Sequence, residues 1–249
     1  MTSVNCSFIQ LKAERYPSNY LGDDVITIYY VDVTKLIPLL SHFQSILNGQ
    51  EIQRSLTFLK KADRDSFIVR RGILRFLLGH LLNYPARSIE FNLGENKRPG
   101  IRLPLDVPLT FSSSHSSGTI AIAIGKCLLG IDIEHINPLF EYQDIAQQFF
   151  SKSEYEYILK SSDPIKTFFI LWTRKEALLK ANSFGIDDDL NLVPSLDGET
   201  LSSHPGLTKS DSWQVKSFNP EADYIISVAS SVEAKFVLVE LNNEDFDLK

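Results

Sequence analysis

The chain has 249 residues, 43% of them hydrophobic and 22% charged, which is the composition of an ordinary globular protein with a sizeable core. Its net charge of −6 argues against nonspecific nucleic-acid binding, which requires a basic surface. Two cysteines, Cys6 and Cys127, are too few for a disulfide framework, and no apolar stretch is long enough to span a membrane. We therefore expect a cytoplasmic protein with no membrane or nucleic-acid partner.

The first half of the chain shows the residue patterns of strands and helices. In chain order, they predict a strand over 25–33, a helix over 35–47, a helix over 63–82, short strands over 88–93 and 109–111, and a strand over 119–124. The helix over 63–82 has an arginine-rich side, and for Arg71 and Arg75 a solvated surface and a phosphate-facing role remain equally open. His115 falls in a predicted serine-rich turn. Its side chain would either form hydrogen bonds within the loop or contact a phosphate.

The second half predicts more helix and then antiparallel strands. The expected elements are a strand over 128–133, helices over 145–150, 154–159 and 164–182, and strands over 213–218, 224–229 and 236–241. Ser151 and Glu154 have the spacing of a capping box at the start of the second of these helices.

Two short motifs carry the chemistry of the sequence. The run GIDIE at 130–134 predicts a strand whose two carboxylates share one face. The run WTRKEALLK at 172–180 predicts a helix on which Trp172, Glu176 and Lys180 are four residues apart and form one stripe. Packing of this strand against this helix would bring three carboxylates and one ammonium group together.

Asp132, Glu134 and Glu176 would repel one another unless a divalent cation lay among them, and ligation by oxygen alone suits Mg²⁺. The neighbouring Lys180 suggests an anionic ligand, most plausibly a phosphate. Each half alone also has an ordinary structural explanation. Carboxylates can alternate with buried residues on an exposed strand, and a Glu–Lys helix pair contributes only about 0.3–0.5 kcal/mol.

Together, these motifs resemble the Sfp-type 4′-phosphopantetheinyl transferases, the family that serves peptide and polyketide synthases. That family carries a G-(I/V)-D-(I/V)-E strand and a W-(S/T)-x-K-E-x-x-x-K helix at about this separation. Further segments resemble family motifs in the same order: RGILR at 71–75, KRP at 97–99, FSSSHS at 111–116 and FFSKSEY at 149–155. The resemblance covers residues 50 to 190 approximately.

The resemblance implies an α/β (α+β) fold made of a pseudo-twofold pair of similar α/β subdomains that hold coenzyme A between them. The N-terminal subdomain, residues 1–118, would bind the nucleotide side of coenzyme A. The C-terminal subdomain, residues 119–249, would carry the magnesium ion and the catalytic carboxylates. Relatives of this length contain both halves in one chain, so we expect a monomer.

The resemblance also implies roles for individual residues. Asp132, Glu134 and Glu176 would bind Mg²⁺ on the pyrophosphate of coenzyme A. The remaining contacts to coenzyme A would be His115 and Arg54 at the 3′-phosphate, Arg98 and Pro99 along the adenine, Ser114 near the phosphates and Lys180 at the pyrophosphate.

The implied reaction is attack by a serine hydroxyl of an acyl or peptidyl carrier protein on the β-phosphate, with release of 3′,5′-ADP. Magnesium and Lys180 would neutralise the charge that develops on the oxygens. Glu176 is the preferred general base, directly or through a water, and Glu154 is the second candidate for ordering that water. A magnesium-bound, hydroxide-like water is a further possibility.

Four positions depart from the family pattern. Ser112 replaces the usual Asn, Ser66 stands where relatives often have a basic residue, Lys97 replaces a Gly, and Ser183 replaces the first Gly after the motif helix. They bear on coenzyme A affinity rather than on the class of reaction.

Two other functions use the same residues. One is a magnesium-dependent nucleotide phosphohydrolase, which needs no carrier protein. The other is a non-catalytic protein of this fold that binds coenzyme A or a carrier protein. For the transferase, we expect an apolar carrier-protein surface within residues 140–159, with Lys152 at its rim facing an acidic partner.

Overall fold

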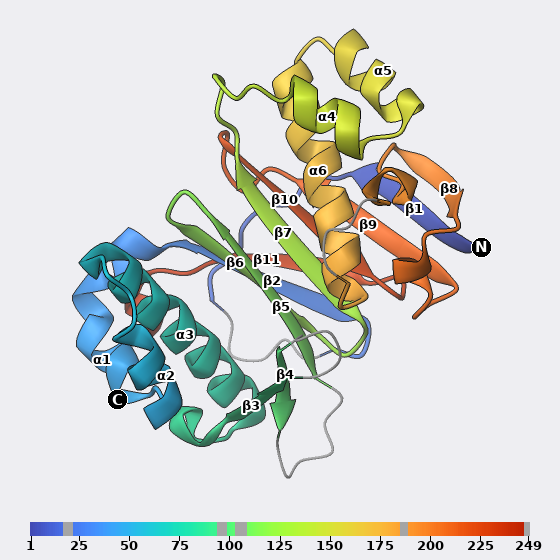
Figure 1. Cartoon of the computed structure of the whole chain (residues 1–249). Coiled ribbons are helices and arrows are strands. Elements are labelled where there is room, and N and C mark those ends of the chain that lie inside the picture. The colour runs from blue at the N-terminus through green and yellow to red at the C-terminus, as the bar shows by residue number, and fades with distance from the viewer. Residues whose placement is uncertain (17–21, 94–98, 103–108, 185–188, 247–249) are drawn as a thin grey trace.

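The computed structural model describes residues 1–16, 22–93, 99–102, 109–184 and 189–246, apart from the side chains of Leu93 and Pro99 (Figure 1). Its strands are β1 (Thr2–Phe8), β2 (Val25–Asp32), β3 (Glu90–Leu93), β4 (Pro99–Arg102), β5 (Thr110–Ser116), β6 (Thr119–Gly125), β7 (Leu129–His135), β8 (Gly198–Ser202), β9 (Ser212–Phe218), β10 (Tyr224–Ser230) and β11 (Lys235–Glu240). Its α-helices are α1 (Leu40–Ser45), α2 (Gly49–Ser55), α3 (Lys61–Leu82), α4 (Gln143–Phe149), α5 (Lys152–Lys160) and α6 (Pro164–Ala181). Short 3₁₀ helices are η1 (Val33–Leu39), η2 (Ala86–Ser88), η4 (Leu190–Leu192), η5 (Pro205–Leu207) and η6 (Asn243–Phe246).

Two mixed sheets form the centre of the fold. The larger has the strand order β7-β10-β9-β1-β8, the smaller has the order β11-β2-β6-β5, and β3 pairs with β4 separately. In each large sheet one pairing is parallel, β1 with β9 and β11 with β2, and the other pairings are antiparallel. The predicted α/β class is confirmed.

Alternation along the strands explains why the sheets stack between helices. In β2, Ile26, Ile28 and Tyr30 join the apolar cluster between the two sheets, whereas Tyr29 and Val31 join the cluster under α1 and α3. Helix α6 covers the outer face of the five-stranded sheet and packs on β7, β9 and β10 (Figure 1). The chain therefore forms four layers, helix, sheet, sheet and helix.

The two halves of the chain exchange strands. β1 belongs to the five-stranded sheet with the C-terminal strands β9 and β10, and β11 returns to the four-stranded sheet beside β2. The β5–β6 hairpin crosses residue 118 and pairs Ser116 with Thr119. The division at residue 118 and the pseudo-twofold pairing stay predictions.

Most predicted elements are present, but three expectations are wrong and β1 was not predicted. The segment 35–47 begins as the 3₁₀ helix η1, which contains Pro38, a residue without a backbone donor. The serine-rich segment after Phe111 is part of β5 rather than a turn, because its backbone pairs with β6 as far as Ser116. β11 is parallel to its neighbour rather than antiparallel.

A glycine allows α6 to approach β7 closely. A Cβ atom on Gly130 would lie 2.1 Å from the carbonyl oxygen of Ala177 and 2.4 Å from the backbone nitrogen of Ala181. Any side chain at this position would push the helix away from the strand. Within the described residues, no helix has the length and hydrophobicity required to cross a lipid bilayer.

Candidate active site

Strand β7 and helix α6 bring the two sequence motifs together. The helix begins after Asp163, whose carboxylate accepts a hydrogen bond from the Lys166 backbone nitrogen at 3.0 Å. Along α6, Trp172, Glu176 and Lys180 are partly exposed, whereas the six residues between them are buried. The stripe predicted from the four-residue spacing is therefore confirmed, and it lies over the outer face of β7.

Lys180 and Ser114 both contact Asp132. Lys180 Nζ lies 2.6 Å from Asp132 Oδ1 and 3.0 Å from Ser114 Oγ, and Ser114 Oγ donates to the same carboxylate oxygen at 2.7 Å. Asp132 is only 3% exposed, and its Oδ2 has no hydrogen-bond partner among the described residues. A buried carboxylate oxygen without a donor is unfavourable, so this atom can accept one more ligand.

The three carboxylates disfavour one another's ionisation. Burial, followed by the charge of Asp132, raises the pKa of Glu134. The same two causes raise the pKa of Glu176 to about 7, with Lys180 opposing the shift and Glu134 adding to it. Burial also raises the pKa of Asp132, against the opposing effects of Lys180 and Ser114. Negative charge is therefore concentrated in a poorly solvated place.

The same side chains offer oxygen ligands, but they do not form a metal centre as they stand. Among the described residues, no three His, Cys, Asp or Glu side chains lie close enough as placed to hold a metal ion. Lys180 instead contacts Asp132, and Ser116 Oγ donates to Glu134 Oε2 at 2.8 Å. The donor set nevertheless fits a hard divalent cation, because it consists of oxygens, includes the unpartnered Asp132 Oδ2 and carries negative charge that a cation would relieve. Asp132, Glu134 and Glu176 stay a predicted magnesium site.

A cavity of about 150 Å³ lies between α3 and β5 and includes Ser114 in its wall. Arg70, Arg71 and His115 contribute cationic or titratable groups to this cavity, and Phe67 contributes an aromatic ring. Burial lowers the pKa of His115, and the positive charges of Arg70 and Lys180 lower it further. The cavity is therefore electropositive, which favours an anionic ligand such as a phosphate.

Comparison with known proteins agrees with this geometry. A family model described as the 4′-phosphopantetheinyl transferase superfamily matches residues 128–229, the span that contains β7 and α6. Over this span the chain is similar to the 4′-phosphopantetheinyl transferase superfamily.

Several relatives of this transferase superfamily match over much of their length. The chain is 27% identical over 222 residues to the 4′-phosphopantetheinyl transferase HetI of Nostoc sp. (strain PCC 7120), which is 86% of this chain and 90% of the relative. It is 28% identical over 186 residues to the putative 4′-phosphopantetheinyl transferase slr0495 of Synechocystis sp. (72% of this chain, 75% of the relative). It is 28% identical over 147 residues to the 4′-phosphopantetheinyl transferase Sfp of Bacillus subtilis (58% of this chain, 63% of the relative).

Other predicted ligand residues lie elsewhere or outside the described residues. Arg54 is exposed, with its guanidinium 5.8 Å from the centre of the Phe58 ring, and it does not line the cavity. Arg98 and the side chain of Pro99 lie outside the described residues. Arg75 is fully buried and contacts Glu51 at 2.6 Å. This decides the open question for Arg75, whose role is structural.

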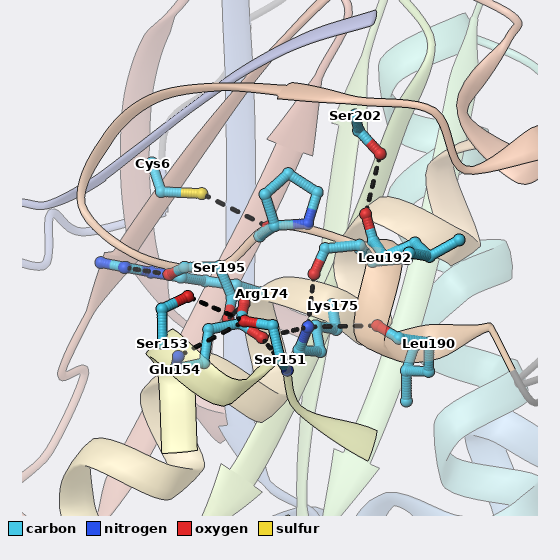
Figure 2. A network of polar contacts seen from close by, with 12 residues as sticks. Cys6, Ser151, Ser153, Glu154, Arg174, Lys175, Leu190, Leu192, Ser195 and Ser202 are labelled. Atoms are coloured by element: carbon cyan, nitrogen blue, oxygen red, sulfur yellow. Dashed lines mark hydrogen bonds and ion pairs between the residues drawn. The ribbon is translucent and has the colours of Figure 1, made fainter. Parts of the chain in front are cut away.

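Glu154, the second candidate for ordering the catalytic water, has several polar partners of its own. Its Oε2 accepts from Lys175 Nζ at 2.9 Å and from the Ser151 backbone nitrogen at 2.8 Å, and its Oε1 accepts from Ser195 Oγ at 2.5 Å. Figure 2 shows these groups directed toward one another in a buried network. The predicted capping box with Ser151 is confirmed. Both oxygens of Glu154 therefore have partners, and its role in ordering a catalytic water stays a prediction.

Two residues of the candidate site were not singled out from the sequence. Arg70 lines the cavity, although only Arg71 and Arg75 were considered for phosphate contact. Ser116 contacts Glu134, although the segment containing it was expected to be a turn. Residues 112, 114 and 116 share one face of a strand, but serines at 113 and 117 hide this pattern in the sequence.

Proposed function

We propose that the chain transfers the 4′-phosphopantetheine arm of coenzyme A to a serine of an acyl or peptidyl carrier protein. The observation that carries this proposal is the junction of β7 and α6. There Asp132 contacts Lys180, and the charge of Asp132 raises the pKa of both Glu134 and Glu176. An electropositive cavity adjoins this group, because Ser114 lines the cavity and also contacts Lys180. Similarity to 4′-phosphopantetheinyl transferases supports the same reaction.

Coenzyme A carries phosphate at two places, and the site has cationic groups at two places. We assign the 3′-phosphate to the cavity that contains His115 and Arg70, and the pyrophosphate to Lys180. Ser114 lies between these groups, since it lines the cavity and contacts Lys180 Nζ at 3.0 Å. A dianionic phosphate beside His115 would favour the protonated imidazole, which the free site disfavours.

The donor set at the other end suits magnesium. Asp132, Glu134 and Glu176 would hold the ion, and Asp132 Oδ2 is the oxygen that has no other partner among the described residues. When bound, Mg²⁺ neutralises charge on the pyrophosphate and stabilises the leaving oxygen.

Glu176 is suited to the proton transfer. Without a metal ion, burial and the charge of Asp132 raise its pKa to about 7. A bound Mg²⁺ would lower this pKa, so a water between the serine and Glu176 would favour the proton transfer. The carrier serine oxygen forms a bond to the β-phosphorus, and the bond from that phosphorus to the bridging oxygen breaks. The serine proton passes to Glu176, directly or through a water, and 3′,5′-ADP departs with the negative charge, which Lys180 helps to neutralise.

The carrier protein, a cytoplasmic location and a monomeric state are parts of this proposal. Within residues 140–159, where the apolar carrier surface is expected, Tyr157 and Leu159 are each 52% exposed. Lys152 begins helix α5 in the same region.

The test is the intact mass of a purified apo carrier protein after incubation with this protein, coenzyme A and Mg²⁺. A mass gain of one phosphopantetheine that requires Mg²⁺, and that disappears in E176Q but not in E156Q, would support the proposal. Glu156 is a matched control because it is an exposed α5 residue paired only with Lys160, at 3.5 Å. Coenzyme A binding without transfer to any carrier would favour a binding protein. Cleavage of a nucleotide without a carrier would favour a phosphohydrolase.

A further inference from the structure

The seam between the two sheets is bridged by serine hydroxyls. β5 is an edge strand of the four-stranded sheet and β7 is an edge strand of the five-stranded sheet. The two strands lie side by side, yet the described structure has no backbone ladder between them. Ser112, Ser114 and Ser116 are alternate residues of β5 and all point toward β7, because their hydroxyls make contacts there.

The contacts follow the two strands in order. They are Ser112 Oγ accepting from the Ile131 nitrogen at 3.2 Å, Ser114 Oγ donating to Asp132 Oδ1 at 2.7 Å, and Ser116 Oγ donating to Glu134 Oε2 at 2.8 Å while accepting from the His135 nitrogen at 3.1 Å. We name these three serines the hydroxyl ladder. The side chains between them, those of Ser113 and His115, face the opposite way because side chains alternate along a strand, and both line the cavity under α3.

We propose that Ser116 is a positioning residue that orients Glu134 for metal binding, as one end of the hydroxyl ladder that fixes the seam. Its hydroxyl uses both of its functions at once, donating its proton to the carboxylate and accepting from the β7 backbone one residue further on. Because the same hydroxyl is tied to the backbone, the position of Glu134 Oε2 is set by the strand and not by the glutamate rotamer alone. The inference rests on the proposed function only in taking Glu134 as a metal ligand.

The three rungs differ in what they do, and the difference makes the proposal testable. Ser112 contacts only a backbone nitrogen on β7, so its loss would weaken the seam without touching a carboxylate. Ser114 also contacts Lys180 and lines the cavity, so its loss would affect several functions together. Ser116 is the rung whose side chain reaches a predicted metal ligand without lining the cavity.

The experiment measures the affinity of the full-length protein for Mn²⁺ alone, as a spectroscopic substitute for Mg²⁺, by electron paramagnetic resonance. S116A should weaken Mn²⁺ binding by about tenfold or more, as is typical when a group supporting a metal ligand is removed. S116T should restore most of the affinity, because it keeps the hydroxyl. S112A should lower the unfolding temperature but leave the affinity for Mn²⁺ unchanged.

Ser3 provides a control with the same chemistry away from the site, because Ser3 Oγ donates to Glu199 Oε1 at 2.5 Å between β1 and β8. S3A should bind Mn²⁺ like the wild type. Should S116A not fold, S116C keeps the side-chain size with only a weak donor and takes its place in the comparison. Unchanged affinity in S116A or in S116C would overturn the proposal.

The outcome is separable from the proposed function. If the wild type modifies carrier proteins while S116A binds Mn²⁺ normally, the positioning role is wrong and the transferase function stands. If the wild type modifies no carrier protein, but S116A binds Mn²⁺ more weakly than the wild type does, the positioning role stands and the proposed function is wrong. If the wild type binds no Mn²⁺ at all, the proposed metal site and the role of Ser116 both fail.

Discussion

Helix α6 carries two lysine–carboxylate pairs that differ in how completely their hydrogen bonds are satisfied. Lys175 and Glu154 are buried, with side chains 0% and 3% exposed, and lie 2.9 Å apart. Lys180 and Asp132 lie 2.6 Å apart, but the lysine side chain is 32% exposed. The first pair is closed to solvent, whereas the second opens toward the surface.

The neighbours of each pair explain the difference. Lys175 Nζ also donates to the carbonyl oxygens of Leu190 and Val193, and Glu154 also accepts from Ser151 and Ser195 (Figure 2). The second pair instead leaves Asp132 Oδ2 unpartnered among the described residues and has two further carboxylates beside it. A satisfied pair holds structure, whereas an incomplete pair with excess negative charge is prepared for a ligand.

Breaking the closed pair should have the largest effect on stability. In K175M, Glu154 would remain buried without its cation, which should lower the free energy of unfolding by about 3–5 kcal/mol. The measurement is urea unfolding followed by tryptophan fluorescence. K160M is the control, because the exposed Lys160–Glu156 pair should contribute no more than about 1 kcal/mol. Equal losses in the two variants would show that the closed pair has no special structural role.

A substitution of Glu176, beside the Lys180–Asp132 pair, should have the opposite effect: it should reduce activity and leave stability intact. E176Q should lower kcat/KM for carrier modification by about 10²–10⁴-fold, the range for loss of a general base. Its thermal stability should not fall, because the change removes one of three carboxylates that repel one another. The check is kcat/KM and unfolding temperature measured together, with E156Q as the control for the same chemical change. If E176Q were destabilised but kept a normal kcat/KM, the group around the Lys180–Asp132 pair would have a structural role rather than a catalytic one.

Gly130 allows α6 to approach β7 closely, and this close approach fixes the position of the helix that carries both lysines. G130A would bring a methyl group against the backbone of Ala177, so the helix must shift, at about 1–3 kcal/mol. Because Glu176 and Lys180 move with the helix, carrier modification should fall in the same variant. G49A is the control, since a Cβ there would meet nothing within 4 Å. Stability and activity in G130A equal to those in G49A would show that the close packing is not required.

The open pair was more predictable from the sequence than the closed one. The spacing of Trp172, Glu176 and Lys180 on a helix is local, so it could be recognised before the structure was known. Lys175 pairs with Glu154 and with carbonyl groups near residues 190–193, contacts that depend on how distant segments pack. The sequence therefore predicted the capping box of Glu154 correctly, but it did not indicate the ion pair with Lys175.

The same distinction applies to the sheets. Alternation predicted most strands, but it could not show that β1 and β11 each join the sheet of the other half of the chain. Strand β5 was missed in part because serine has low strand propensity, and its hydroxyls find partners only once β7 lies beside it. Long-range pairing, rather than local propensity, decides these features.

The smallest expected effect is on the pKa of His115, which reports directly on the charge of Lys180. Burial, the charge of Arg70 and the charge of Lys180 lower the pKa of His115 in that order. The folded state therefore resists protonation, and its stability declines as pH falls below the unfolded value near 6.5, because the unfolded chain then binds more protons. In K180M the pKa of His115 should rise toward that value, and the decline in stability should become shallower.

An NMR titration of the His115 ring protons, with assignment by H115Q, measures this shift. K160M removes the same charge from an exposed helix position and should leave the pKa of His115 unchanged, because screened surface charges act weakly over distance. If K180M also left it unchanged, the charge of Lys180 would not reach the cavity. The Lys180–Asp132 pair and the cavity that contains His115 would then be electrostatically independent. Binding of a phosphate in the cavity would not be expected to alter the charge state of the Lys180–Asp132 pair.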